Sequence, residues 1–311
     1  MKKTGRLQRQ DLRWRLQTDM PYYVMLIIPM AFFIIFKYWP MFGLSIAFQN
    51  YKAGAPFLGD SVKWVGLRWF KQFFSYPFAW RLITNTLILS VYNLAVTFPL
   101  AIFLALILNE IRNRKVKQFT TTLSFLPYFI STTVVVGMMT NFLNINDGII
   151  NQMIVSMGGT AKDFMGASQY FRTLYVLSGC WQNLGFDAIV FTAAIAGIDP
   201  GLYEAAFVDG STRFKNVFLI TLPNILPTII IILIMRVGHL MSVGHEKVIL
   251  MYSERIYDTA DVLSTYAYRS GILDNKWGYS TAIGLMNSVV NLILVVATNA
   301  LSRKLTENSL W

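Results

Sequence analysis

Residues 196–227 read AGIDPGLYEAAFVDGSTRFKNVFLITLPNILP and predict two short helices joined by a glycine turn. Asp199 is a favourable N-cap, and Pro200 stands at the first helical position, where its missing N–H costs nothing. Gly210 supplies the positive φ that ends the first helix, and Ser211 is expected to cap the second. Apolar segments flank this stretch on both sides, so it forms a structured loop between them.

The flanking segments belong to a set of six that are each long enough to cross a bilayer. A hydrocarbon core of about 30 Å needs about 20 mostly apolar helical residues. Of the 311 residues, 55% are hydrophobic and only 14% are charged, which excludes a disordered chain and argues against a soluble enzyme. The single cysteine, Cys180, excludes a disulfide framework. The predicted spans cover residues 22–44, 84–108, 119–143, 171–198, 225–243 and 281–301.

Loop charges predict the orientation of these spans. Residues 1–20, the loops between spans 2 and 3 and between spans 4 and 5, and the tail hold fourteen Lys and Arg against seven Asp and Glu. The three longer loops of the other side hold ten against eight. Both termini are therefore expected in the cytoplasm. The net charge of +11 is mainly a topology signal, and nucleic acid is not an expected partner.

The long outer loops carry amphipathic segments instead of linker sequences. Residues 62–80 interleave aromatic and basic side chains, which is typical of interfacial anchoring and less often of contact with a partner protein. Residues 149–157 and 261–273 are expected to form further short helices, the latter with Asp261 as N-cap. Prolines inside spans 1, 2 and 3 (Pro29, Pro99 and Pro127) predict kinks.

The loop quoted first carries a family pattern. Glu204-Ala-Ala, then Asp209-Gly210, then Ile220 and Leu222-Pro223 resemble the EAA motif of permease subunits of type I ABC importers. Ser211 replaces the alanine that usually follows the glycine, which is a small-for-small change. In that family the loop forms the coupling helices that dock into the ATPase. The resemblance implies this coupling role for Glu204, Ala205, Ala206, Asp209, Gly210, Ser211 and Pro223.

Further stretches resemble the LplB-like family of complex oligosaccharide and polysaccharide permeases. They are LNEIRNR (108–114), LPYFIS (126–131), AAIAGIDPGLYEAA (193–206), DVLSTYAYR (261–269) and SRKLTENSLW (302–311). A common family form has histidine where Tyr128 stands, a departure that bears on substrate and not on fold.

This resemblance implies an all-α integral membrane protein of the bacterial plasma membrane with a MetI/MalF-like permease fold. Residues 1–20 would be a basic cytoplasmic segment, and residues 21–311 a single permease domain with its coupling loop at 199–224. Its implied partners are a second, homologous permease in a heterodimer, two copies of an ABC ATPase, an extracytoplasmic sugar-binding lipoprotein, the oligosaccharide and membrane lipid.

Energy for transport is expected to come from another chain. The sequence has no G-x-x-x-x-G-K-[ST] phosphate-binding loop, so it is not expected to hydrolyse ATP. We expect no catalytic residues and no cofactor on this chain, with ATP and Mg²⁺ bound by the partner ATPase. His239 and His245 are six residues apart, and His245-Glu246 does not extend to H-E-x-x-H, so no metal site is expected.

Polar side chains inside spans are the candidates for substrate contact, because such groups are expensive in a bilayer and usually face the interior. They are Tyr128 and Asn141 in span 3, Trp181, Gln182, Asn183 and Asp187 in span 4, and Asn287 and Asn291 in span 6. Span 5 adds Arg236 and His239, and Arg236 is able to pair with Asp187. Hydrogen bonding between helices is an equally good explanation for each residue singly.

The sequence therefore favours a permease that imports oligosaccharides by alternating access. One alternative is an ABC permease for a non-sugar solute. Another is a carrier driven by an ion gradient, which predicts internal repeats and several intramembrane carboxylates, whereas Asp187 is the one acid found within a predicted span. An integral-membrane enzyme would need a metal cluster or an acid–base pair, and the sequence shows neither.

Overall fold

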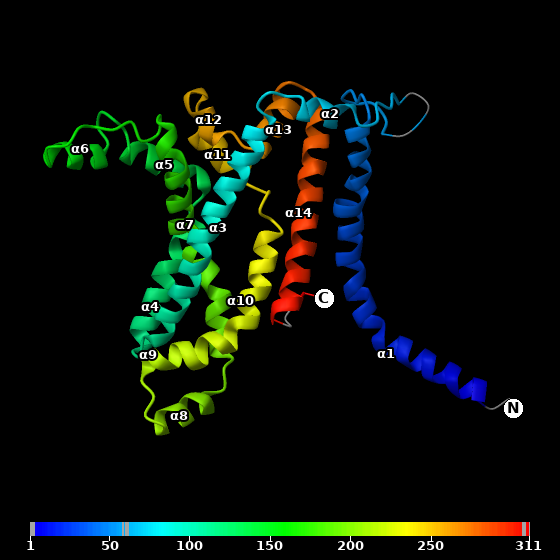
Figure 1. Ribbon diagram of the computed structural model, residues 1–311. Helices are drawn as coiled ribbons and strands as arrows, with labels where there is room; N and C mark the ends of the chain where they lie inside the picture. The colour runs from blue at the N-terminus through cyan, green and yellow to red at the C-terminus, as the bar shows by residue number, and fades with distance from the viewer. Residues whose placement is uncertain (1–3, 58, 60–61, 307–308, 311) are drawn as a thin grey trace.

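The computed structural model is all-helical, with long helices standing side by side (Figure 1). It describes residues 4–57, 59, 62–306 and 309–310, and of residues 4–18 and 305–306 the backbone alone. Lys2 and Lys3 of the basic N-terminal segment therefore lie outside the described residues. The helices are Thr4–Phe33 (α1), Arg68–Phe74 (α2), Ala79–Glu110 (α3), Arg114–Phe125 (α4), Thr132–Phe142 (α5), Ile149–Ser156 (α6), Ser168–Ala196 (α7), Pro200–Val208 (α8), Arg213–Asn216 (α9), Leu222–Val237 (α10), His245–Met251 (α11), Tyr257–Ala260 (α12), Leu263–Tyr268 (α13) and Trp277–Thr306 (α14).

Four helical stretches are long and apolar enough to cross a membrane by themselves. They cover Asp19–Phe48, Ala79–Glu110, Arg213–Val237 and Trp277–Lys304. The number rises to six if each of two bent pairs, α4 with α5 and α7 with α8, counts as one crossing. The expected six spans therefore depend on how these two bent pairs are counted.

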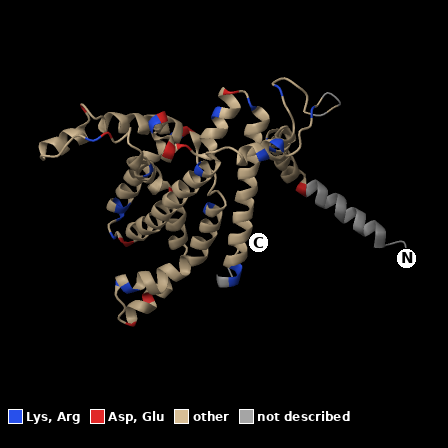
Figure 2. Cartoon of the chain, turned by 45° about the horizontal axis from the view of Figure 1, so that its top comes forward, with Lys and Arg blue, Asp and Glu red and all other residues tan. Residues whose placement is uncertain are grey.

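The two ends of the bundle carry different elements. One end holds α8, α9, the α3–α4 loop and the C-terminal end of α14, and the other holds α2, α11, α12 and α13 (Figure 1). Figure 2 marks Lys and Arg positions at the first end, around α9 and at the end of α14. The segments expected in the cytoplasm thus lie together, while their orientation in a membrane stays a prediction.

Close packing of α3 on α7 forms the centre of the bundle. Ala101 and Ala105 of α3 meet Ala188 of α7 in one buried cluster, together with Phe191 and Ile225. Small side chains let two helix backbones approach closely, which is a main source of helix association in membranes. Nearer the other end, Leu89 of α3 packs with Phe171 and Val176 of α7.

The third predicted span, 119–143, is broken into α4 and α5 near Pro127, where the sequence predicted a kink. The axes of α4 and α5 differ by 93°. Pro127 lies in a 3₁₀ turn over Leu126–Phe129, Ile130 is extended, and Ser131 caps α5 by accepting a hydrogen bond from the Val134 N–H at 3.3 Å. Gln182 of α7 donates to the freed Ile130 carbonyl at 2.7 Å, so a neighbouring helix satisfies the break.

The fifth predicted span, 225–243, is misplaced. Helix α10 ends at Val237, and the helical stretch begins earlier, at Arg213, through a π-helical turn over Val217–Thr221. A Cβ on Gly238 would lie 2.1 Å from Val295 Cγ2, so this helix end passes against α14. Asn291 of α14 accepts a hydrogen bond from the Met241 N–H at 2.9 Å and thereby satisfies the turn that follows α10.

Residues 252–273 fold back as a cap on the outer ends of α3 and α7. Asn85 of α3 donates to the carbonyls of Asp258 and Asp261 at 2.9 and 3.1 Å, and Arg172 of α7 donates to Asn85 Oδ1 at 2.9 Å. The Leu263 N–H donates to Thr86 Oγ1 at 3.0 Å. These bonds join the cap to two spanning helices.

An ion pair between Asp261 and Arg269 holds this cap together. Arg269 donates to both carboxylate oxygens, at 3.1 and 2.6 Å, and its guanidinium also lies over the Tyr257 ring, 4.6 Å from the centroid. Burial alone would lower the pKa of Arg269, but hydrogen bonds to Asp261 and Tyr252 outweigh burial and raise it. Asp261 was expected as an N-cap, but its carboxylate instead accepts from the side chains of Thr265 and Arg269.

Helix α1 contacts the remaining bundle little. No residue in the most apolar window of its span is buried, and the span reaches α14 through the 3₁₀ segment Trp39–Phe48. Figure 1 shows α1 standing beside α14 and away from α3 and α7. Its apolar surface therefore needs lipid or another chain to cover it.

We predict that Arg269→Gln destabilises the protein because it leaves the Asp261 carboxylate buried without its cation. The expected cost is about 3–5 kcal/mol. The measurement is the loss of monodisperse protein on heating in detergent. Lys276→Gln is the matched control, because Lys276 pairs with Asp274 at 3.2 Å where both side chains are more than half exposed, and it should change little. Equal losses in both variants would contradict this assignment.

We also predict that Gly185→Ala loosens the contact between α7 and α4. A Cβ at this position would lie 2.1 Å from the Ser124 carbonyl oxygen, so backbone must move, at a cost of about 1–3 kcal/mol. Gly137→Ala in α5 is the control, since nothing lies within 4 Å of its added Cβ and alanine favours a helix. The same heating assay should show a loss for Gly185→Ala alone, and a Gly185→Ala variant as stable as its control would refute the close contact.

Candidate functional site

The loop over residues 199–224 projects α8 from one end of the bundle (Figure 1). Asp199 Oδ1 accepts a hydrogen bond from the Gly201 N–H at 2.9 Å, which confirms the expected N-cap. Gly210 has φ of +74°, and the Ser211 N–H donates to the Ala206 carbonyl at 2.9 Å, which closes α8 as a glycine C-cap does. The projecting part of the loop, α8, is therefore a helix that is capped at both ends.

The second helix of the loop begins differently from the prediction. Thr212, not Ser211, caps α9 by accepting from the Lys215 N–H at 3.4 Å, while Ser211 Oγ donates to Asn216 Oδ1 at 2.5 Å. The Tyr203 hydroxyl lies 2.9 Å from Thr221 Oγ1, where the helical stretch continues toward α10. This bond ties α8 to the base of a spanning helix.

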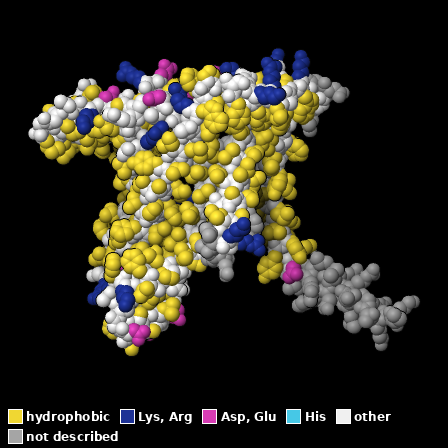
Figure 3. Space-filling view, viewed as in Figure 1, with side chains coloured by type: hydrophobic (Ala, Val, Ile, Leu, Met, Phe, Trp, Pro, Cys, Tyr) yellow, Lys and Arg dark blue, Asp and Glu magenta, His cyan; other side chains and the backbone are white. Residues whose placement is uncertain are grey.

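Apolar side chains stand exposed at the tip of this loop. Phe207 is 79% exposed, Val208 84% and Phe214 76%. Glu204 and Asp209 are exposed on the same short helix and at its end. Figure 3 shows hydrophobic and acidic side chains together on this projecting tip. An exposed apolar surface next to charges is typical of a site for a protein partner.

A groove of about 410 Å³ runs between the tip and the end of α3. Its lining includes Tyr203 and Phe207 from α8, Arg213 from α9, and Glu110 and Arg112 from the end of α3 and the loop that follows it. The sequence reasoning gave Glu110 and Arg112 no role. Their place in LNEIRNR (108–114), one of the stretches with family resemblance, was the available signal.

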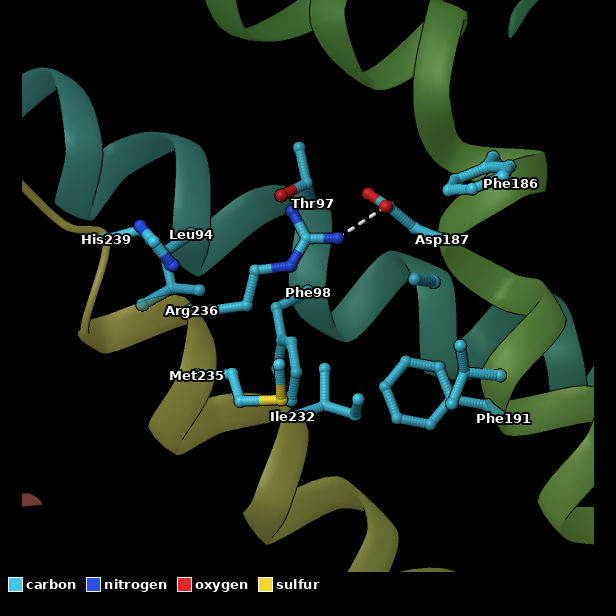
Figure 4. A pocket seen from close by; sticks show the side chains of 12 residues that line it. Leu94, Thr97, Phe98, Phe186, Asp187, Phe191, Ile232, Met235, Arg236 and His239 are labelled. Atoms are coloured by element: carbon cyan, nitrogen blue, oxygen red, sulfur yellow. Dashed lines mark hydrogen bonds and ion pairs between the residues drawn. The ribbon is translucent and has the colours of Figure 1, made fainter. Parts of the chain in front are cut away.

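A cavity of about 230 Å³ lies in the middle of the bundle, between α3, α7 and α10 (Figure 4). Asp187 of α7 and Arg236 of α10 form an ion pair across it, as the sequence allowed. A second cavity of about 210 Å³ continues from it and shares Arg236 and His239, and it adds Ser90, Asn93 and Ser242 to the lining. Polar groups thus line a route from mid-bundle toward the segment after α10.

The structure brings Asp187 alone of the eight candidate pathway residues into this cavity. Trp181 lines a separate, largely apolar cavity of about 540 Å³ between α5, α6 and α7. Tyr128 stacks on Phe186, with ring centroids 4.1 Å apart, and Asn141 is exposed at the end of α5. Asn93 of α3, which lines the second cavity, was missed by the sequence reasoning.

The other amide candidates are engaged in hydrogen bonds within the bundle, with one exception. Gln182 donates to the Ile130 carbonyl, Asn183 donates to the Gly179 carbonyl at 2.9 Å, and Asn291 holds residues 241–242. Asn287 Oδ1 is buried and has no hydrogen-bond partner among the described residues. Hydrogen bonds within the bundle therefore account for the polar side chains of Gln182, Asn183 and Asn291 without a substrate.

Comparisons with known proteins agree with this architecture. Residues 97–307 match the family described as binding-protein-dependent transport system inner membrane component. The chain is 39% identical over 290 residues to the polygalacturonan/rhamnogalacturonan transport system permease protein YteP of Bacillus subtilis (strain 168), covering 93% of this chain and 89% of the relative. It is 39% identical over 297 residues to protein LplB of the same organism, covering 95% and 92%.

A solved structure is similar over nearly the whole chain. It is a bacterial alginate ABC transporter in complex with an alginate pentasaccharide-bound periplasmic protein, and the matched chain has a TM-score of 0.86 and 38% identity, covering 95% of this chain and 98% of that one. Extensive sequence similarity and the same arrangement of helices thus point to one class of protein. The chain belongs to the family of binding-protein-dependent transport system inner membrane components, which are the multi-pass permease subunits of ABC importers whose ATPase is a separate subunit.

Proposed function

We propose that the chain is one of two permease subunits of an importer that moves oligosaccharides into the cytoplasm by alternating access. The exposed helix α8 carries this proposal. A membrane subunit that has no phosphate-binding loop needs a docking site for the ATPase that drives it. Glu204, Ala205, Ala206, Asp209, Gly210, Ser211 and Pro223 form the coupling site.

Two side-chain contacts and one helix connect the coupling site to the central cavity. Tyr203 of α8 bonds to Thr221, and the helix continues from Thr221 into α10, which carries Arg236. The Asp187–Arg236 ion pair then joins α10 to α7. A rotation of α8 in a closing ATPase dimer therefore reaches the cavity walls directly.

A second permease is needed to complete the passage. The apolar span of α1 is uncovered in the single chain, and both central cavities are smaller than the roughly 300–1,000 Å³ of ordinary ligand pockets. Surfaces of a homologous partner would cover α1 and enlarge the passage. An extracytoplasmic sugar-binding lipoprotein would deliver the sugar to the end that carries α2 and α11–α13.

The relatives favour a sugar over a non-sugar solute. One is named for transport of polygalacturonan and rhamnogalacturonan, and the similar solved structure belongs to an alginate transporter. Both share more than a third of their residues with this chain over most of its length. In this importer ATP and Mg²⁺ would bind the two copies of the ATPase. Tyr128 and Trp181, which are partly exposed aromatic residues, remain proposed platforms for sugar rings.

The coupling site is tested by Gly210→Val in the tagged protein, purified in mild detergent with its partners. A β-branched residue is strained at φ of +74°, so α8 should lose its closing turn. We expect retention of the ATPase to fall about tenfold, which corresponds to about 1.4 kcal/mol, while the second permease still co-purifies.

Gly158→Val is the matched control. Gly158 has φ of +85° and no atom within 4 Å of an added Cβ, so it carries the same kind of strain at the opposite end of the bundle, after α6. Its ATPase should be retained in full. If wild type purifies without an ATPase, or if both variants lose it equally, the proposed coupling role is wrong.

A further inference from the structure

We propose that Arg236 binds a carboxylate group of an acidic oligosaccharide in the central cavity, in exchange for Asp187. The proposal rests on the proposed function and adds to it the charge of the substrate and the residue that recognises it. It follows from an imbalance of charge along the two central cavities and from the unused hydrogen-bonding capacity of Arg236.

Arg236 is held by one contact only. Among the described residues its guanidinium makes a single hydrogen bond, from Nη2 to Asp187 Oδ1, and its side chain is 44% exposed. A guanidinium has five N–H donors in a planar fork that suits a carboxylate in a bidentate arrangement. Figure 4 shows Arg236 reaching from α10 across the cavity to Asp187 on α7. Its remaining donors are therefore available to a ligand in the cavity.

A second cation, Lys247 of α11, lies at the end of the same route that is near the cap. Lys247 Nζ donates to the Tyr175 carbonyl at 2.9 Å and lies 4.7 Å from the centroid of the Tyr175 ring. An ion pair for Lys247 is absent from the part of the chain that the structure describes. Burial lowers its pKa to about 8, so the ammonium group is still mostly charged at pH 7.

Arg236 lines both central cavities, and Lys247 lies next to the lining of the second one. Tyr175 lines the second cavity together with Asn93 and Arg236. A Cβ on Gly179 would lie 3.1 Å from Lys247 Nζ and 4.0 Å from Asn93 Oδ1, which places the ammonium group beside this lining. The route thus has two cations, the imidazole of His239 and one carboxylate. An uncompensated cation in a membrane protein is costly, so a negative ligand is the expected complement.

Exchange at Arg236 has a mechanical consequence. In the empty cavity Asp187 occupies the guanidinium and joins α7 to α10. A substrate carboxylate that takes over Arg236 releases Asp187 and so removes this ion pair between the two helices while the sugar is present. The two cavities of about 230 and 210 Å³ are this chain's share of the passage, which the second permease would enlarge. An acidic chain would then pass from Lys247 to Arg236.

The test measures binding of trigalacturonate to the assembled permease pair with its ATPase in lipid nanodiscs, without the binding protein. The uncharged comparison is the fully methyl-esterified trisaccharide, and citrate tests a carboxylate without a sugar. Wild type should bind trigalacturonate at least about tenfold more tightly than the ester or citrate. Arg236→Gln should lose this preference, so that trigalacturonate and its methyl ester bind with similar affinity.

Asp187→Asn distinguishes exchange from a purely structural ion pair. It removes the competitor, so affinity for trigalacturonate should rise roughly threefold to tenfold, an effect that damage to the fold would not produce. Lys247→Gln should weaken binding of the acid, and Lys276→Gln, at an exposed ion pair outside the cavity, should change nothing. Equal weakening of acid and ester by Arg236→Gln, lower affinity in Asp187→Asn, or equal binding of citrate would overturn the proposal.

Uptake by the complete importer in liposomes separates this inference from the proposed function. If neither trisaccharide enters in the presence of ATP and the binding protein, the proposed sugar import fails, and the acidic site fails with it. If both enter and Arg236→Gln slows both equally, sugar import stands and the charge recognition is wrong.

Discussion

Hydrocarbon offers no hydrogen bonds, so the backbone groups freed at a break in a spanning helix need partners within the protein. The chain meets this constraint at two places. Gln182 of α7 takes the carbonyl freed at Ile130, and Asn291 of α14 takes the N–H freed after α10. In the same way, Asn85 of α3 holds two carbonyls of the cap. Each bond joins a broken element to an intact helix. These polar side chains therefore hold the helices in place, as the frame of the bundle, and their hydrogen bonds are not free for a substrate.

This frame leaves a small number of places where parts can move. The small-residue contact between α3 and α7, with the cap held by Asp261 and Arg269, makes one body. Helix α10 continues from the loop that carries α8, packs on this body through Ile225 and forms the Asp187–Arg236 ion pair, which lies in a cavity. A packed interface resists gradual deformation, whereas an ion pair beside open volume can exchange partners. A movement of α8 that is driven by the ATPase can therefore change the shape of the passage at this cavity.

Sequence reasoning was most successful where local chemistry decides the structure. Asp199, Pro200 and Gly210 specify α8 by capping rules alone, and its bounds followed. It failed where tertiary contacts override local pattern. Pro127 predicted a kink in the span 119–143, but it did not reveal a bend of 93°, which Gln182 from another helix stabilises. The sequence placed Asn287 and Asn291 in span 6, but it did not reveal that Asn291 holds the end of α10. Polar residues in a span look alike in sequence, whether they bind a neighbour or line a cavity.

Alternating access is the central claim, and the accessibility of His239 tests it most directly. His239 is exposed, lines both central cavities and is absent from the ion pair. In the assembled importer with Cys180→Ala, His239→Cys is treated with a membrane-impermeant thiol reagent applied from either side. The account predicts labelling from the cytoplasmic side without nucleotide, and from the outer side when a non-hydrolysable ATP analogue holds the ATPase closed. Labelling from the same side in both states would contradict it.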